Sequence, residues 1–184
     1  MLLLAALAAG SAPARAEELS PRKQALLLLR VLVYDRNLRA RAGGAVRVAV
    51  AYRAGDRQSE ERRDQMVGAF EEVAREVVVA GMPVEVVAVP YRDEADFESR
   101  LRAPSPACLY VCAGLELVVK EIAAATRRHA VVSAAGSKEL VEAGLAIGLV
   151  NRGQRAAVVV NLAAARGEGA DLEAALLAIA EVIR

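Results

Sequence analysis

The stretch CLYVCAGLELVVKEIAAATRRHAVVSA, residues 108–134, decides the fold class of this chain. It begins with the short apolar run CLYVCA, continues through residues 115–127, whose pattern predicts a helix, and ends with the apolar run AVVSA. A strand, a helix and a second strand form a βαβ unit, in which the two strands run parallel and the crossover is right-handed. The sequence therefore predicts an α/β protein with a mostly parallel sheet.

The same alternation continues upstream of this unit. The apolar runs AVRVAVAY, residues 45–52, and VEVVAVP, residues 84–90, predict two further strands. Between them the spacing of apolar residues predicts a helix over residues 59–79, and Asp93 is placed to cap a short helix that ends near Leu101. Strands and helices thus alternate over most of the chain.

Downstream, the segment LAIGLVNRGQRAAVVVNL, residues 145–162, predicts a hairpin with Gly153 at its tip. We expect a final amphipathic helix from Asp171, because apolar residues recur on one helical face at Leu172, Ala175, Leu176, Ile179, Val182 and Ile183. The predicted architecture is a three-layer, Rossmann-like α/β domain with a C-terminal β-hairpin and a final amphipathic helix.

Composition is consistent with this class of fold. The 184 residues are 55% hydrophobic but only 3% aromatic, with no Trp, so the core is built from Val, Leu, Ile and Ala, as a buried parallel sheet requires. Basic and acidic residues number 24 and 23, without a clustered basic run, so the sequence carries no electrostatic signature of nucleic-acid binding.

The first sixteen residues, MLLLAALAAGSAPARA, have the pattern of a secretory signal peptide. A short apolar run precedes Ala14-Arg15-Ala16, so we expect cleavage after Ala16, a periplasmic location and a single domain over residues 17–184. An N-terminal core helix or an interfacial segment is the alternative. The apolar run is shorter than the roughly 20 residues that cross a bilayer, so we expect no transmembrane span.

The helix predicted after Ser20 and Pro21 has apolar residues almost all round. They are Leu26, Leu27, Leu28, Leu29, Val31, Leu32 and Val33. One face of a helix suffices to cover a sheet, so the surplus predicts a homodimer or partner interface, with Leu26, Leu29, Leu32 and Val33 as candidate residues. Cover by neighbouring helices of the same chain is the alternative.

The chain offers little for metal, redox or catalytic chemistry. Cys108 and Cys112 lie at i and i+4 of a predicted strand, about 13 Å apart, whereas a disulfide needs Cα atoms within about 7 Å. We therefore expect both thiols to stay unpaired within a monomer, as small apolar core side chains; an intermolecular bridge, or a metal pair if the segment were helical, is the alternative. His129 is the single histidine, and no partner for it as a metal ligand or catalytic base is evident. The sequence predicts no catalytic residues, no metal and no cofactor.

A small anionic ligand is a further possibility. In parallel sheets ligands sit beyond the carboxyl ends of the strands, where this chain has Gly55, Asp56, Gly114, Gly136 and Ser137. Glycines and small polar residues are equally ordinary at βα turns, so turn and cap chemistry is the alternative. Neither a G-x-G-x-x-G nor a P-loop fingerprint occurs.

The C-terminal half, from CLYVCAG through the end, resembles the YfiR-like family of periplasmic regulatory proteins. The pattern Val160-Asn161-Leu162-Ala163-Ala164 matches an I-N-L-A-A pattern of that family, and KQALLLLRVLVYDRNL is similar to its first helix after the signal peptide. For Asn161 we favour a structural role, since an Asn that closes a strand can bond the backbone of the following turn. Asp171 is likewise interpreted as structural, at the start of the last helix.

The resemblance implies a non-enzymatic periplasmic protein of cyclic-di-GMP signalling. Such a protein binds the periplasmic part of an inner-membrane diguanylate cyclase or sensor kinase and restrains its output. A solute-binding lobe that captures a small anion at the βα turns is the alternative. An enzyme is disfavoured, because no nucleophile, base and orienting group can be nominated together.

Overall fold

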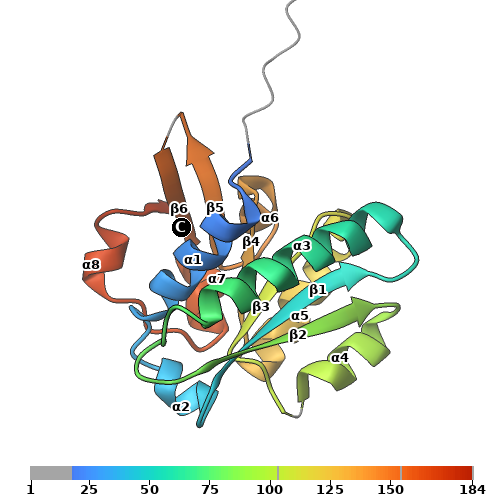
Figure 1. Cartoon of the computed structure of the whole chain (residues 1–184), viewed down its shortest axis with the longest axis horizontal. Helices are drawn as coiled ribbons and strands as arrows, with labels where there is room; N and C mark the ends of the chain where they lie inside the picture. Colours follow the sequence, from blue (N-terminus) through green and yellow to red (C-terminus); the bar gives the residue numbers. More distant parts are fainter. Residues whose placement is uncertain (1–17, 103, 154, 184) are drawn as a thin grey trace, which may run out of the picture.

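The computed structural model describes residues 18–102, 104–153 and 155–183, and a seven-stranded sheet lies at its centre (Figure 1). Across the sheet the strands are β2 (Val84–Tyr91), β1 (Val46–Arg53), β3 (Cys108–Val111), β4 (Val132–Ala135), β5 (Ile147–Arg152), β6 (Arg155–Asn161) and β7 (Glu181–Ile183). The five strands β2, β1, β3, β4 and β5 pair in parallel in this order. β6 is antiparallel to β5, and β7 is parallel to β6. The predicted mostly parallel sheet and its hairpin are confirmed. The predicted signal peptide, residues 1–16, lies outside the described residues.

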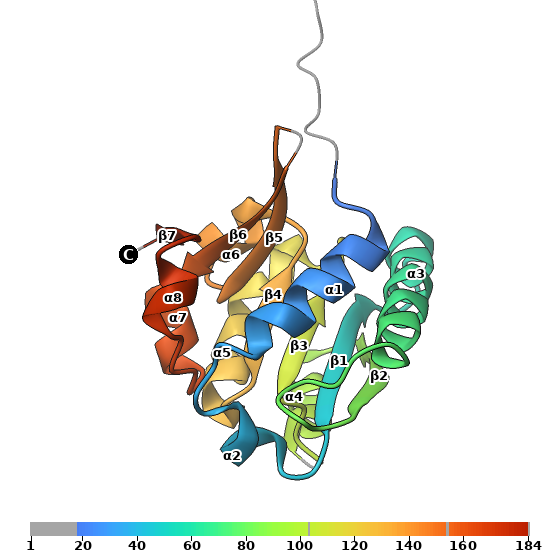
Figure 2. The same cartoon turned by 60° about the vertical axis from the view of Figure 1, so that its left-hand side comes forward.

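Helices cover both faces of the sheet, as Figure 2 shows from the side. One face packs against α1 (Pro21–Leu32) and α3 (Arg57–Ala74), and the other against α4 (Glu94–Arg102), α5 (Val119–His129) and α6 (Lys138–Glu142). Shorter elements are α2 (Leu38–Ala42), η1 (Glu116–Val118), α7 (Leu162–Gly167) and α8 (Ala174–Leu177). Within the described residues, no helix has both the length and the apolar character that a membrane crossing requires.

The central strands β1, β3 and β4 are largely buried on both faces, and their successive side chains enter different layers. In β1, Val48 and Val50 pack in the layer of α1 and α3, whereas Ala49 and Ala51 pack in the layer of α4 and α5. Val, Leu and Ala therefore serve as core residues on either side, which explains how a chain with so few aromatic residues fills two layers.

The first helix is shorter than the sequence predicts. The side chain of Ser20 accepts the Lys23 N–H at 3.4 Å and Pro21 occupies the first turn, as expected, but α1 ends at Leu32. A turn follows in which the Asp35 carboxylate accepts the Asn37 N–H at 3.0 Å, and this contact separates α1 from α2. Local bonding by the Asp side chain thus replaces helical bonding here.

The second predicted helix differs at both ends. α3 begins at Arg57 because Asp56 is its N-cap, accepting the Ser59 N–H at 2.9 Å. It ends at Ala74 rather than near Val79, which instead forms an antiparallel bridge with Met82 just before β2.

The predicted final amphipathic helix is wrong in most of its length. Only α8 is helical, and Asp171 neither starts nor caps it; the N-cap residue is Glu173. Val182 and Ile183 belong to β7, which pairs with β6 at Val160 and Asn161. β-Branched side chains favour a strand, and the outer edge of β6 offers one a place to pair.

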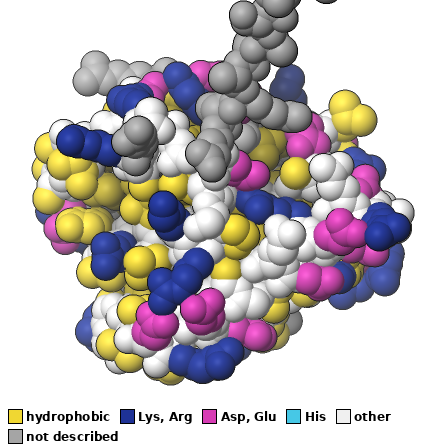
Figure 3. Space-filling model, turned by 45° about the horizontal axis from the view of Figure 1, so that its top comes forward, with side chains coloured by type: hydrophobic (Ala, Val, Ile, Leu, Met, Phe, Trp, Pro, Cys, Tyr) yellow, Lys and Arg dark blue, Asp and Glu magenta, His cyan; other side chains and the backbone are white. Residues whose placement is uncertain are grey.

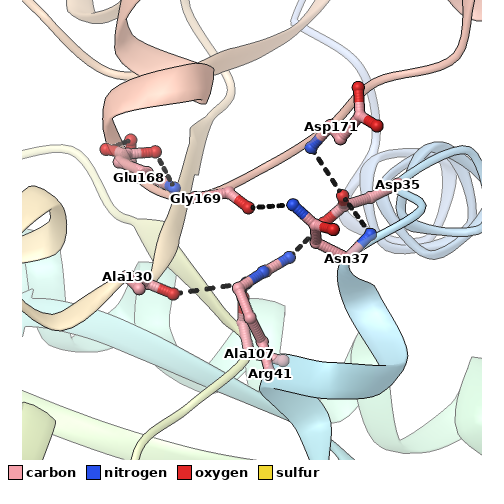
Figure 4. A network of polar contacts seen from close by, with 9 residues as sticks. Asp35, Asn37, Arg41, Ala107, Ala130, Glu168, Gly169 and Asp171 are labelled. Atoms are coloured by element: carbon pink, nitrogen blue, oxygen red, sulfur yellow. Dashed lines mark hydrogen bonds and ion pairs between the residues drawn. The ribbon is translucent and has the colours of Figure 1, made fainter.

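A buried ion pair closes the end of the sheet where the parallel strands begin (Figure 4). Asp35 is 4% exposed, and one of its carboxylate oxygens pairs with the Arg41 guanidinium while the other accepts the Asp171 N–H at 2.9 Å. Arg41 also donates to the carbonyl of Ala107, just before β3, at 2.6 Å and to that of Ala130, just before β4, at 3.4 Å. Arg41 thereby joins α2 to the turn at Asp35 and to the residues just before β3 and β4.

We predict that Arg41→Met costs about 3–5 kcal/mol of unfolding free energy, because it leaves the Asp35 carboxylate buried without its cation. Chemical denaturation measures the loss. Arg36→Met is the matched control, since Arg36 is an exposed side chain that lies 3.7 Å from Asp171, and there we expect a loss below about 1 kcal/mol. Equal losses in the two variants would contradict the role assigned to Arg41.

Both cysteines are free and buried in one layer. They point to the same face, as positions i and i+4 of an extended chain must. Burial raises the pKa of the Cys108 thiol and of the Cys112 thiol to about 12. Both side chains therefore act as small apolar groups of the core.

We predict that a thiol reagent titrates two groups in the denatured, non-reduced monomer and neither group at a comparable rate in the native protein. The thiolate is the reactive form, and here it is both disfavoured and inaccessible. The same count after reduction is the control. A count of zero in the denatured, non-reduced monomer would show that the two cysteines pair, against the geometry of the strand.

Candidate functional site

The sequence placed candidate ligand-binding residues where parallel strands end, and the structure brings Gly55, Asp56 and Gly114 together around Ser59. The Ser59 hydroxyl donates to the carbonyl of Ala113 at 2.7 Å and accepts the Arg53 N–H at 2.9 Å. Gly114 lies so close that an added Cβ would be 3.1 Å from the Cβ of Ser59. This buried serine therefore ties the turn after β1 to the turn after β3.

The backbone donors in these two turns are already engaged by carboxylates of the same chain. The Gly55 N–H donates to Glu60 at 3.0 Å, and the Gly114 N–H donates to Glu116 at 3.0 Å. An external anion at either turn would have to displace a negative side chain. Turn and cap chemistry, the alternative considered for the sequence, accounts for the contacts observed here.

Gly136 and Ser137 lie at the end of β4, beside a hollow of about 740 Å³. Ser137 is the N-cap of α6 and accepts the Leu140 N–H at 3.3 Å. Gly136 has room for a hydrogen only, because a Cβ there would lie 2.6 Å from the side-chain oxygen of Gln24. The lining consists of Glu18, Ala113, Gly136, Ser137, Lys138, Glu139, Val150, Asn151, Arg152 and Glu181.

Charges of both signs line this hollow, and the pairs among them neutralise one another. Glu181 on β7 lies 2.9 Å from Lys138 and forms a second ion pair with Arg152 of the hairpin. Lys138 lowers the pKa of Glu181, and Glu181 in turn raises the pKa of Lys138. Figure 3 looks toward this end of the molecule and shows basic, acidic and apolar side chains interspersed, without a large field of one sign.

A buried amide lies directly against Gly136. Gln24 of α1 is fully buried; its Nε2 donates to the carbonyl of Leu19 at 2.7 Å and its Oε1 accepts the Tyr110 hydroxyl. Burial raises the pKa of Tyr110, so its hydroxyl keeps the proton that it donates. Glu18, at the lip, pairs with Arg62 of α3. These contacts fix the start of the described chain against the ends of β3 and β4.

Sequence reasoning missed the charged residues of the hollow. Glu181 was assigned to a helix, so nothing linked it to Lys138 or Arg152. The weak signal available was the position of Lys138 directly after a strand and of Arg152 at the hairpin turn, two places that the topology brings to the same end of the sheet.

The residues interpreted as structural have different roles. Asn161 is the N-cap of α7: its Oδ1 accepts the Ala164 N–H at 3.0 Å and its Nδ2 donates to the carbonyl of Val141 at 3.2 Å. Asp171 instead takes part in the network around Asp35 through its backbone N–H. His129, at the end of α5, lies 3.1 Å from Glu98 of α4. Among the described residues, no group of three or more His, Cys, Asp or Glu side chains is arranged to hold a metal ion.

The candidate interface residues, three on α1 and Val33 at its C-cap, divide into two sets. Leu29 and Leu32 are each 1% exposed and pack inside this chain, so they are not available to a partner, and for them the alternative of cover within the chain holds. Val33 is 50% exposed and Leu26 is partly buried. Because these two lie seven residues apart they share one side of the helix axis, next to the exposed Arg30.

Comparisons with known proteins point to one family and one fold. A family model described as YfiR/HmsC-like matches residues 59–181. No curated protein sequence matches the chain. Among solved structures, a conserved domain protein from Vibrio cholerae is similar with a TM-score of 0.64 at 14% identity, over 92% of this chain and 62% of that one.

Two further structures share the fold at low identity. An ABC domain from Streptococcus pneumoniae in complex with L-Trp gives a TM-score of 0.62 at 12% identity, over 91% of this chain and 64% of that one. A ligand-free, open structure of a substrate binding protein with adhesive properties from Clostridium difficile gives a TM-score of 0.56 at 14% identity, over 80% of this chain and 57% of that one. The chain thus spans about three fifths of the length of these proteins, and the likeness concerns the fold.

Proposed function

The chain belongs to the YfiR/HmsC-like family, and we propose that it binds and restrains the periplasmic part of an inner-membrane signalling protein, a diguanylate cyclase or a sensor kinase. The family is one of periplasmic regulators of diguanylate cyclase signalling. The observation that carries the proposal is the family match over residues 59–181, which extends from α3 to the first residue of β7. Restraint of the partner would require no chemistry, only a surface.

The arrangement of the turns supports a role of this kind. The backbone donors of Gly55 and Gly114 are engaged by Glu60 and Glu116, and Ser59 is consumed in joining two turns. The two thiols are buried in the core. These polar groups hold the fold together, and we assign binding to the outer surface of the molecule instead.

On that surface we propose the exposed side of α1 around Val33 and Leu26 as the contact with a partner or with a second copy of the chain. Val33 exposes half of an apolar side chain, and Arg30 beside it supplies a charge at the rim. An apolar centre with a charged edge is the usual composition of a protein interface. Leu29 and Leu32 take no part, since they anchor the helix to the sheet.

We predict that Val33→Lys weakens binding to the periplasmic part of the membrane protein at least tenfold while leaving the fold intact, because a charge that water tolerates is costly when an interface buries it unpaired. Titration calorimetry measures the affinity and circular dichroism the fold. Light scattering on the same samples reports self-association.

Leu117→Lys is the matched control, since Leu117 is 93% exposed in η1, away from α1. We expect this variant to bind like the wild type. If the wild-type chain fails to bind and its deletion leaves cellular cyclic di-GMP unchanged, the regulatory role is wrong. If both variants bind alike, the contact lies elsewhere on the surface.

A small-molecule role is the second candidate, and the hollow beside Gly136 and Ser137 favours it. Its lining presents Lys138 and Arg152 to a negative group, provided that the ligand replaces Glu181 as their partner. One structure of similar fold is described as a substrate binding protein. Ligands beyond the carboxyl ends of parallel strands are common in such folds.

We predict for this candidate that a small anion at about 100 times its dissociation constant stabilises the protein by about 2.7 kcal/mol in a thermal-shift screen. Lys138→Ala should reduce the shift, whereas Lys120→Ala, which removes an exposed lysine of α5, should not. A screen without any shift would count against the ligand and leave the binding of a protein partner as the function.

A further inference from the structure

Glu168 is a carboxylate in the core, directly after α7. It is 0% exposed, and its partners are neutral. The Ser133 N–H of β4 donates to one carboxylate oxygen at 2.8 Å. The Ser133 hydroxyl at 2.6 Å and the Thr126 hydroxyl at 2.7 Å contact the other. In the part of the chain that the structure describes, no cation lies within hydrogen-bonding distance of this carboxylate, in contrast to Asp35 with its Arg41.

Few charges face this carboxyl group from the surrounding elements. Arg127 of α5 is the cation whose charge acts most on Glu168. The aliphatic part of the Arg127 side chain packs against Gly167, where an added Cβ would lie 3.1 Å from the Arg127 Cδ. Arg41 of α2 and Asp35 lie beyond Gly169, and Cys108 of β3 is a further titratable neighbour. Burial outweighs the hydrogen bonds from Ser133 and Thr126 and the charge of Arg127, and raises the pKa of Glu168 from 4.5 to about 7.

The surrounding hydroxyl groups can satisfy either protonation state. When Glu168 is ionised, the hydroxyls of Thr126 and Ser133 both donate to it. When it is protonated, its own O–H can donate to the Thr126 oxygen, because the Thr126 hydroxyl has a second acceptor in the carbonyl of Ala123 at 3.1 Å. The Ser133 oxygen meanwhile accepts the Ala146 N–H at 2.9 Å in both states. Rotation of one hydroxyl thus accompanies the proton, and no polar atom in this set loses its partner.

The segment that follows Glu168 is held to the body by polar contacts, some of which Figure 4 shows, by Leu172 and Leu176 in the core and by the pairing of β7 with β6. Asn37 donates to the carbonyl of Gly169 at 3.0 Å, and the Asp171 N–H donates to Asp35. The Glu173 N–H donates to the carbonyl of Tyr34 at 2.9 Å. The chain then continues through α8 to β7, whose Glu181 pairs with Lys138 and Arg152 across the hollow. Glu168 anchors the start of this segment to α5 and β4 from inside the core.

We propose that Glu168 is a proton-dependent lock, which in its protonated form holds residues 168–183 against α5 and β4 and on ionisation allows this segment to loosen. Glu168 lies outside the proposed partner surface on α1, and the test of this lock does not depend on that surface. It would make the position of β7, and with it the ion pairs of Glu181 at the hollow, depend on the pH around an exported protein.

The direction of the effect follows from linkage. A carboxyl group that binds its proton more tightly in the docked state than in the open state favours docking at low pH. The contribution is fully present below the ordinary carboxyl pKa of 4.5 and is lost as the pH rises through about 7. Between pH 5.5 and 8.5 the equilibrium constant for opening should rise on the order of 30-fold.

Hydrogen exchange of residues 168–183, corrected for the intrinsic pH dependence of exchange, tests the lock in the full chain. We expect opening of this segment to increase about 30-fold in the wild type over that range, and to be independent of pH in Glu168→Gln, which keeps the shape of the side chain but cannot ionise. Glu173→Gln, on the same segment, should keep the wild-type dependence. A wild type without pH dependence, or a Glu168→Gln variant that retains it, would overturn the proposal.

Ser133→Ala provides an independent test should Glu168→Gln fail to fold. This change removes a hydroxyl that donates to the carboxylate while the Ser133 backbone N–H remains. Loss of a donor to the anion raises the pKa of Glu168 further, so the opening transition should move to higher pH. A transition that stays in place or moves to lower pH would exclude Glu168 as the group responsible.

Discussion

The ion pair of Asp35 and Arg41 is the contact on which the arrangement of the layers depends. Parallel strands leave their N-terminal ends open, and each strand there must be entered from a separate loop. Arg41 reaches the carbonyls before β3 and β4, while Asp35 receives the backbone of the α7–α8 connection. A guanidinium group suits this position because its fork of donors can serve several acceptors at fixed angles. Its Nε nevertheless finds no partner among the described residues, which is a cost of burying it.

Much of the fold could be predicted because local signals and tertiary packing agree. The βαβ unit of residues 108–134, the cap at Ser20 and the hairpin tip at Gly153, whose φ is +63°, all reflect local chemistry that tertiary contacts did not override. The errors in the predicted elements arise where a contact with a residue distant in the sequence determines the local structure. Nothing in the sequence around Asp35 shows that Arg41 and Asp171 will stabilise a turn there. Nothing near Val182 shows that the edge of β6 will bind it as a strand.

The candidate site shows the same division. Gly55, Asp56 and Gly114 do lie together, as parallel topology requires, but Ser59, the residue that joins them, was interpreted only as the start of a helix. The Gly55 and Gly114 N–H groups donate to Glu60 and Glu116, and these contacts depend on side-chain geometry that the spacing of residues alone does not reveal. For α1, hydrophobicity correctly indicated extensive burial, yet it could not tell Leu29 and Leu32, which face the sheet, from Val33, which faces solvent. The difference is one of rotation about the helix axis.

Two buried carboxylates lie close together in this fold, and the kind of partner each has determines how it responds to its surroundings. Asp35 is held by a cation, so protonating it would leave the Arg41 guanidinium uncompensated in the core. Glu168 is held by hydroxyls and one amide, which stabilise a charge only partly and accept a proton without loss. Asp35 accepts a backbone N–H of the connection between α7 and α8, and Glu168 is the first residue of that connection. The connection therefore has one anchor that is an ion pair and one that is a carboxyl group with neutral partners, and the second is the group that we propose responds to pH.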